Sequence, residues 1–112
     1  MAAKYELKVN KKQQYSFNLK AGNGEIILTS ETYQSRDGAL TGIQSVQSNG
    51  GDDSGFIIKK AKNGELYFVL MAKNNQVIGR SEMYKTEAGA RRGIASVRRN
   101  AGAKVSDLTL AK

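Results

Sequence analysis

The chain contains the same module twice. When Tyr5 is aligned with Phe56, an offset of 56 − 5 = 51 residues, the two halves match without a gap. Among the matches, Phe17 pairs with Phe68, and Ser30-Glu31-x-Tyr33 pairs with Ser81-Glu82-x-Tyr84. A module of roughly 50 residues buries too little surface to be stable alone, and a repeat of this length governs the whole fold. We therefore predict one domain over residues 1–112, in which repeat 1 (about 4–51) and repeat 2 (about 55–102) share a core.

Three strands are predicted at the start of each repeat. Apolar and polar residues alternate over Tyr5–Val9 and Tyr15–Ala21, and Ile26–Leu28 follows an Asn23-Gly24 pair. Such alternation is typical of half-buried strands, and Asn-Gly favours a hairpin turn with positive φ. The equivalent strands of repeat 2 are expected around Phe56–Lys60, Leu66–Ala72 and Val77–Ser81. Each repeat thus begins as an antiparallel meander.

A helix is predicted after each meander. Ser35 and Thr86 are the expected N-caps, because a hydroxyl can accept a hydrogen bond from a free amide of the first turn. Apolar residues then recur at helical spacing until glycines end the pattern. They are Ala39, Ile43 and Val46 before Asn49-Gly50-Gly51, and Ala90, Ile94, Val97 and Ala101 before Gly102. Gly42 and Gly93 lie beside these apolar faces and predict close packing against the sheet or the other helix. A closing strand is expected at residues 104–110.

The composition excludes several classes of chemistry. The chain has no Cys and no His, and it therefore lacks disulfides, thiolate ligands, and the commonest general base and metal ligand. Ser30 and Ser81 each precede a glutamate, but without His a nucleophilic serine lacks its usual base. We interpret these pairs as hydrogen-bonding motifs at strand ends, with Tyr33 and Tyr84 anchoring the next turn. No catalytic residue, metal site or cofactor is predicted.

Targeting signals are also missing from the sequence. No apolar run approaches the ~20 residues that span a bilayer, and the first residues lack a charged leader followed by an apolar stretch. A cytoplasmic protein without membrane association is therefore expected.

The two Ser-Glu-x-Tyr segments, each following an alternating strand and preceding a capped helix, support a family resemblance. In this arrangement the chain resembles the YegP-like family of small bacterial proteins, whose function is unknown. The resemblance implies an α+β fold in which two β-β-β-α repeats form one antiparallel sheet backed by two helices. It also implies a closing C-terminal strand and an exchange of closing strands between the repeats. Because one-repeat members would pair two chains to reach this shape, the two repeats here stand in for a dimer, and a monomer is expected.

Positive charge is concentrated in repeat 2. Of the net charge of +8, residues 1–51 contribute six basic and four acidic residues (+2), and residues 52–112 contribute twelve and six (+6). The second helix carries a cluster made of Arg91, Arg92, Arg98 and Arg99, for which repeat 1 has Leu40, Thr41, Gln47 and Ser48. A helical wheel places Arg91 and Arg98 on a flank and the other two arginines outward. The arginines could bind phosphates or simply form a solvated face that complements the helix dipole.

A second difference between the repeats is predicted on the sheet face that points away from the helices. Tyr67, Val69 and Met71 stand there where repeat 1 has Ser16, Asn18 and Lys20. With Lys59 and Arg80 nearby, this face could stack single-stranded bases or bind a protein. Alternatively, Val105–Leu110 or a second chain covers it.

These observations predict a non-catalytic binding module whose basic second repeat binds an acidic partner. Nucleic acid is the first candidate partner and an acidic protein the second. The alternative is a protein interaction or structural module that uses the apolar outer face of repeat 2. The candidate binding residues are Arg91, Arg92, Arg98, Arg99, Lys59, Tyr67 and Arg80.

Overall fold

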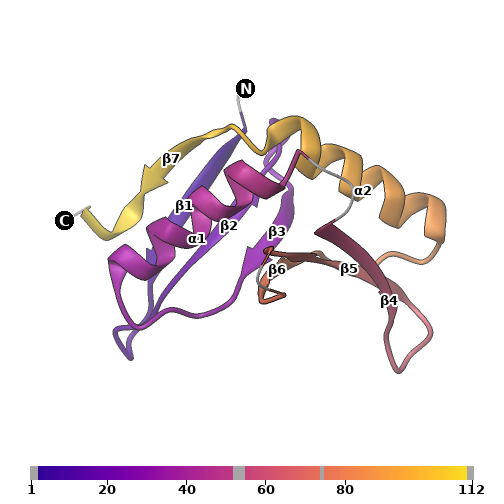
Figure 1. Ribbon diagram of the computed structural model, residues 1–112, viewed down its shortest axis with the longest axis horizontal. Coiled ribbons are helices and arrows are strands. Elements are labelled where there is room, and N and C mark those ends of the chain that lie inside the picture. Colours follow the sequence, from indigo (N-terminus) through magenta and orange to yellow (C-terminus); the bar gives the residue numbers. More distant parts are fainter. Residues whose placement is uncertain (1–2, 52–54, 74, 111–112) are drawn as a thin grey trace.

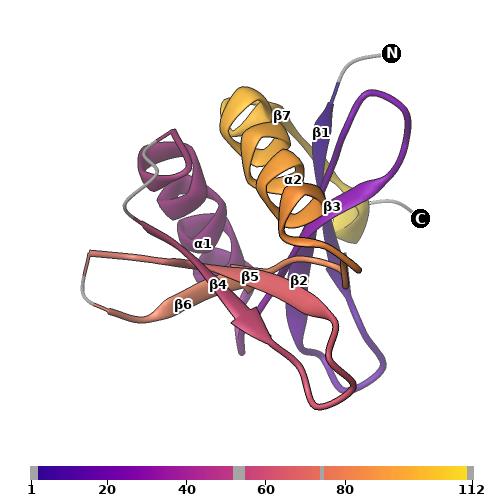
Figure 2. The ribbon, with the colours of Figure 1, turned by 90° about the vertical axis from the view of Figure 1, so that its right-hand side faces the viewer.

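The computed structural model describes residues 3–51, 55–73 and 75–110, which form one seven-stranded sheet with two helices on one face (Figures 1 and 2). The elements of repeat 1 are β1 (Lys4–Val9), β2 (Tyr15–Lys20), β3 (Ile26–Ser30) and α1 (Arg36–Asn49). Those of repeat 2 are β4 (Phe56–Lys60), β5 (Leu66–Met71), β6 (Val77–Arg80) and α2 (Glu87–Asn100). The predicted α+β class and its two β-β-β-α units are confirmed.

The closing segment differs in shape from the predicted strand at 104–110. It consists of a short strand, β7 (Lys104–Asp107), followed by a 3-10 turn, η2 (Leu108–Leu110). Asp107 explains the break, because its carboxylate accepts a hydrogen bond from the backbone amide of Thr109 at 2.9 Å. A side chain that bonds the backbone two residues ahead favours a turn over a continuing strand.

The strand order is β4-β5-β6-β3-β2-β1-β7, and the two meanders meet at its centre. There β3 and β6 pair antiparallel, with Thr29 opposite Arg80. At one edge, β7 leaves repeat 2 and pairs with β1 of repeat 1, which is the predicted exchange of the closing strand. This pair is parallel, whereas the sheet was expected to be antiparallel throughout. The reason is that α2 ends beside the start of β1, where the Tyr5 hydroxyl donates a hydrogen bond to the Ala101 carbonyl. The chain therefore enters β7 from the end at which β1 begins.

Both helices pack on the same face of the sheet and reach across the junction between the repeats. Helix α1 contacts β1 and β2 of its own repeat and also β6, and α2 contacts β5 of its own repeat and also β3. The buried side chains of the two repeats form one cluster. Its largest fully buried members include Tyr5, Phe17, Leu19, Leu28, Phe68 and Leu70. Each repeat thus completes the core of the other.

The predicted N-caps are confirmed, and the helix ends show a different role for glycine. Ser35 Oγ accepts from the Gly38 amide and Thr86 Oγ1 from the Gly89 amide, both at 3.0 Å. The C-caps are Gly50 (φ −70°) and Ala101 (φ −58°), so neither end uses a left-handed residue. A Cβ at Gly50 would lie 2.9 Å from the Ala101 Cβ. Glycine at this position allows the two helix ends to meet.

Gly42 and Gly93 each allow a tyrosine ring to pack directly against the helix backbone. A Cβ at Gly42 would lie 2.4 Å from the Tyr33 Oη, and one at Gly93 would lie 2.3 Å from the Tyr84 Oη. Each tyrosine stacks in turn on a core phenylalanine, with ring centroids 6.4 and 6.2 Å apart. Burial raises the pKa of both tyrosines, and nearby glutamates add to this effect. The predicted close packing is therefore present, and the close neighbour is the tyrosine of the Ser-Glu-x-Tyr segment.

The serines of these segments fasten the end of the third strand to the second strand. Ser30 Oγ accepts from the Phe17 amide at 2.8 Å and donates to the Glu31 carbonyl at 2.7 Å. Ser81 repeats both bonds, with the Phe68 amide at 2.9 Å and the Glu82 carbonyl at 2.7 Å. The interpretation of the Ser-Glu pairs as hydrogen-bonding motifs is confirmed.

Among the residues that the structure describes, four turn residues have positive φ, and they form two repeat-equivalent pairs. Gln13 (φ 63°) corresponds to Gly64 (φ 87°), and Gly24 (φ 87°) corresponds to Asn75 (φ 67°). In the predicted Asn23-Gly24 turn, positive φ therefore falls on Gly24. Both repeats therefore have the same turn geometry, although one residue of each equivalent pair is not glycine.

Candidate binding groove

The two repeats present equivalent edges of the sheet, and the closing segment covers one of them. Strand β1 is paired on its outer side with β7, and Tyr5 and Leu7 are 0% exposed. Strand β4 lies at the other end of the strand order and has no outer strand partner within the described ranges. Its residues Phe56 and Ile58, equivalent to Tyr5 and Leu7, are half-buried. The two edges have similar sequences, and they differ because β7 covers β1 while β4 is left accessible.

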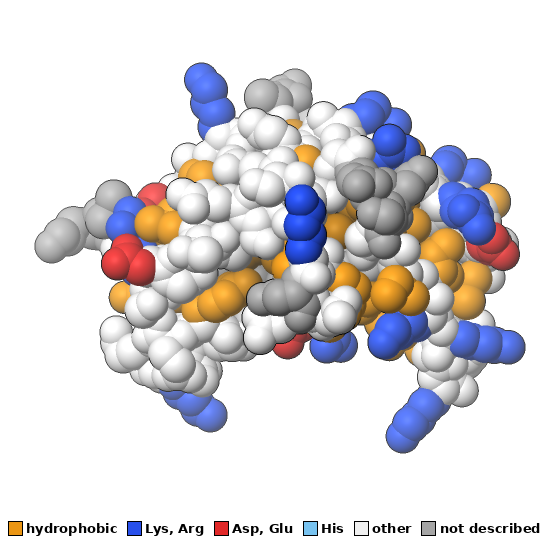
Figure 3. All heavy atoms as spheres, in the orientation of Figure 1, with side chains coloured by type: hydrophobic (Ala, Val, Ile, Leu, Met, Phe, Trp, Pro, Cys, Tyr) orange, Lys and Arg blue, Asp and Glu red, His pale blue; other side chains and the backbone are white. Residues whose placement is uncertain are grey.

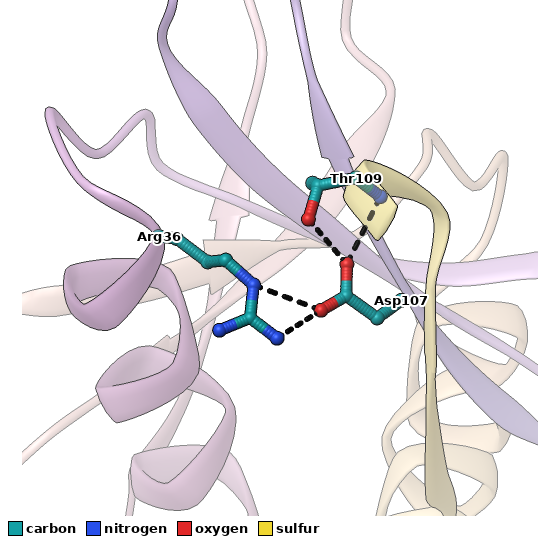
Figure 4. A network of polar contacts seen from close by, with 3 residues as sticks. All are labelled: Arg36, Asp107 and Thr109. Carbon is teal, nitrogen blue, oxygen red and sulfur yellow. Dashed lines mark hydrogen bonds and ion pairs between the residues drawn. The ribbon is translucent and has the colours of Figure 1, made fainter. Parts of the chain in front are cut away.

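The cover over β1 is anchored at both ends. At one end the Tyr5 hydroxyl binds the Ala101 carbonyl that precedes β7. At the other end Arg36, at the start of α1, donates from Nε to Asp107 at 2.9 Å and forms a second contact through its terminal nitrogen (Figure 4). Burial acts to raise the pKa of Asp107, but hydrogen bonds from Thr109 and Arg36 outweigh it and hold the pKa below its usual value.

The uncovered edge forms one wall of an open groove of about 480 Å³ between β4 and α2. Its lining residues are Phe56, Ile58, Arg91, Ile94, Ala95 and Arg98. In Figure 3, hydrophobic side chains gather between α2 and β4, with Lys and Arg side chains around them. Subtraction of the repeat offset gives Tyr5, Leu7, Leu40, Ile43, Gln44 and Gln47 as the corresponding residues of repeat 1. The groove thus corresponds to the site beside β1 and α1.

Two arginines mark the ends of this groove. Arg91 and Arg98 are separated by two helical turns, or roughly 10 Å along the axis of α2. Arg91 contacts Glu87 through Nε at 2.8 Å and through its terminal nitrogen at 2.7 Å. A carboxylate of the same helix therefore already binds part of the Arg91 guanidinium group. Arg98 Nε donates to the Gly51 carbonyl at 3.3 Å. An apolar floor between two cations suits an acidic ligand with apolar side chains.

The other predicted arginines point to different surroundings, although all four arginines are exposed. Arg92 lines a separate hollow together with Glu25 and Glu82, on the side of α2 that faces repeat 1. Arg99 shares a shallow outer hollow with Arg98 and Gly51. Arg99 therefore adjoins Arg98 on the outer side of α2, Arg92 lies apart, and of the four arginines only Arg91 and Arg98 line the groove.

Lys59, Tyr67 and Arg80 lie on the opposite face of the sheet. Lys59 pairs with Tyr67, and Arg80 pairs with Val69. Because Phe68 faces the core, its neighbours along β5 face away from the helices. Arg80 lies 3.7 Å from the Glu31 carboxylate. The seven candidate residues thus divide between two faces of the molecule.

The outer face offers less apolar surface than the sequence suggested. Val69 is only 4% exposed, and Tyr67 and Met71 are half-buried. The idea that Val105–Leu110 covers this face is wrong, because β7 pairs with β1 at the far edge of the sheet and the following turn η2 also contacts β1.

The groove was missed in the sequence, although one signal for it was present. Two equivalent first strands, β1 and β4, are followed by a single closing segment after repeat 2. One segment can cover only one edge, so Phe56, Ile58 and Ala95 could have been expected to stay accessible.

Other classes of site find little support among the described residues. No group of three or more metal-binding side chains is present in them. Neither described helix is long and apolar enough to cross a membrane.

Comparisons with known proteins place the chain in a family. The family model for "Domain of unknown function (DUF1508)" matches residues 10–54 and 61–107. A UPF0339 protein of Mannheimia succiniciproducens is 54% identical over 94% of both chains, and the UPF0339 protein YegP of Yersinia pestis is 53% identical over 95% of this chain and 96% of its own. The solution structure of yegP from E. coli, a protein of unknown function, superimposes with a TM-score of 0.90 at 47% identity, covering 96% of this chain and 94% of that one. The chain belongs to the DUF1508 family, and UPF0339 proteins, YegP among them, are its homologues.

Proposed function

We propose that this protein is a non-catalytic binding module that receives an acidic partner in the groove between β4 and α2. One observation carries the proposal: the position that the closing segment fills in repeat 1 is open in repeat 2 and has gained two arginines. Leu40 and Gln47 of repeat 1 correspond to Arg91 and Arg98. An exposed apolar patch with charge at its rim is typical of an interaction surface.

The absence of His and Cys supports the non-catalytic part of the proposal. The two serines next to glutamates are also engaged, since each hydroxyl accepts one backbone hydrogen bond and donates another. A hydroxyl held in this way is a structural group.

The test compares two double variants that install the residues of repeat 1. Arg91→Leu with Arg98→Gln changes the groove, and Arg92→Thr with Arg99→Ser removes the same charge elsewhere on α2. Labelled protein is titrated with a glutamate-rich peptide at low and moderate salt, and the amide shifts are followed by NMR. We expect saturable shifts along β4 and α2 that the first variant loses and the second keeps. Equal binding by both variants, or no shifts at low salt, would refute the groove.

Nucleic acid is the alternative acidic partner, favoured by the net charge of +6 in residues 52–112. A phosphate backbone would draw on basic residues all around α2, and its binding would weaken steeply with salt as counterions are released. The same titration with short single-stranded and duplex DNA and RNA tests this reading. Loss of binding in both double variants would favour nucleic acid, whereas loss in the groove variant alone favours an acidic protein.

A further inference from the structure

The free edge of β4 and the closing segment point to the form of the partner. We propose that the groove receives an extended peptide segment that adds to the sheet as a strand parallel to β4, with acidic side chains facing α2. This inference rests on the proposed function and specifies the class of partner. Strand addition to a free sheet edge is a common mode of peptide recognition, in which the main chain supplies affinity and alternate side chains supply specificity.

The closing segment is an internal template for such a ligand. In repeat 1, Val105 lies opposite Tyr5 and Asp107 lies opposite Leu7, in parallel register. Alternate residues of a strand share a face, so Val105 and Asp107 both face the helix side, where Asp107 reaches Arg36. Applied to repeat 2, the same register places an apolar residue opposite Phe56 and an acidic residue opposite Ile58.

The charges of repeat 2 fit an acid at that second position. The residue equivalent to Arg36 is Glu87, but Arg91 stands one helical turn further along. The cation has therefore moved by one turn, and the Glu87 carboxylate now lies on Arg91 as a ligand carboxylate would. At the other end, Gln47 Nε2 contacts the Ala103 carbonyl at 3.4 Å, just before β7 begins. Arg98 occupies the corresponding position in repeat 2 and can donate a hydrogen bond to the backbone at the start of the added strand.

Charge also argues against a second copy of this chain as the occupant. The exposed Lys59 and Lys60 lie on β4, and pairing of two such edges would place four lysines on one short pair of strands. Lysines on an edge strand are a known device against self-association. They favour an acidic strand instead.

The probe for the test is a peptide with the sequence of Ala103–Leu110, in which Lys104→Glu removes the positive charge and Asp107 supplies the acid that faces α2. Two further versions are N-methylated on alternate residues, one at positions 104 and 106 and the other at 105 and 107. N-methylation blocks the hydrogen bonds of one strand edge and leaves charge and side chains unchanged. Labelled full-length protein is titrated with each peptide and followed by NMR.

We expect saturable shifts along β4 and α2 with the unmethylated peptide, and at least a tenfold weaker affinity for one methylated version only. A nitroxide at the peptide N-terminus should broaden the amide of Phe56 more than that of Lys60, as parallel pairing requires. Glu87→Gln, which releases Arg91, should strengthen binding.

Three outcomes would overturn strand addition. They are equal binding of both methylated versions, stronger broadening at Lys60, and shifts that appear on raising the protein concentration alone, which would identify a second copy as the occupant. If the glutamate-rich peptide still binds wild type and not the Arg91→Leu, Arg98→Gln variant, the proposed function stands and only the strand geometry fails. If neither peptide binds, both fail.

Discussion

The outer edges of β1 and β4 begin from the same module and end in different states. Tyr5 and Leu7 are fully buried under the closing segment, while Phe56 and Ile58 line an open groove. The interiors behind them are nearly identical, with the same Ser-Glu-x-Tyr segment, the same tyrosine-phenylalanine stack and the same helix glycine. The repeat has therefore kept the residues that build the core, and it has changed those around the edge that remained accessible.

The largest expected effect tests the shared interior. Gly42→Ala and Gly93→Ala should each lower the free energy of unfolding by about 1–3 kcal/mol, because the new methyl group would collide with a tyrosine held by stacking. Urea unfolding measures the change. Gly102→Ala is the control, since nothing lies within 4 Å of a Cβ there. A marked cost at only one of the two helix glycines would show that the interiors are not equivalent.

The turn pair of Gln13 and Gly64 should respond with opposite signs. Gly64→Ala places a Cβ at positive φ and should cost about 1–2 kcal/mol, whereas Gln13→Gly should stabilise the protein by up to about 1 kcal/mol. No neighbouring atom lies within 4 Å of a Cβ at Gly64, so the effect is purely conformational. Thermal unfolding of both variants measures it, and a loss of stability in both would contradict the shared turn geometry.

The covered edge itself is tested at Tyr5. Tyr5→Phe makes repeat 1 resemble repeat 2 and leaves the buried Ala101 carbonyl without its donor, at a cost of about 1 kcal/mol. Phe56→Tyr should change stability little, because its groove is open. Equal effects of the two substitutions would remove the distinction between the edges.

The same position predicts a pH dependence. Burial raises the pKa of Tyr5 in the folded protein, so its contribution to stability is fully present below the unfolded value of about 10 and is lost as the pH rises above it. Tyr5→Phe should therefore flatten part of the decline in stability between neutral and alkaline pH. Unfolding curves at a series of pH values measure this, and an unchanged slope would show that Tyr5 does not contribute.

The smallest expected effect concerns the anchor of the closing segment. Arg36→Gln should lower stability by less than about 1 kcal/mol, because the Arg36 side chain is 39% exposed and solvent screens the pair. Since the folded pKa of Asp107 is depressed, this contribution is present above its unfolded pKa and fades as the pH falls through the folded value. Hydrogen exchange of β7 reports the anchor directly. Slower exchange in the variant would contradict this role.

Local patterns in the sequence predicted the elements well, because each depends on near neighbours. Alternation marked the strands, and Ser35 and Thr86 marked the helix starts, since a cap needs only a hydroxyl and an amide three residues ahead. The predicted role of the Ser-Glu pairs was confirmed for the same reason. The closing strand was placed correctly but extended too far, because the Asp107 to Thr109 bond that turns the chain was not recognised.

The candidate site was less predictable because it depends on which strands and helices lie side by side in the folded chain. A helical wheel separated Arg91 and Arg98 from Arg92 and Arg99 but could not show that β4 faces the first pair. Lys59, Tyr67 and Arg80 were grouped with the arginines by charge, and the sheet separates them. The burial of Val69 could not be read from its alternation with Phe68 and Leu70.

The repeat, the order of strands and helices, their caps and the lack of His and Cys chemistry are all evident from the amino-acid sequence. These features follow from the covalent chain and from contacts between residues close along it. The parallel pairing of β7 with β1, and the free edge of β4 beside two arginines, depend instead on how the elements pack in three dimensions. The sheet has two equivalent edges and the chain has one closing segment, so the exposed site follows from where that segment docks.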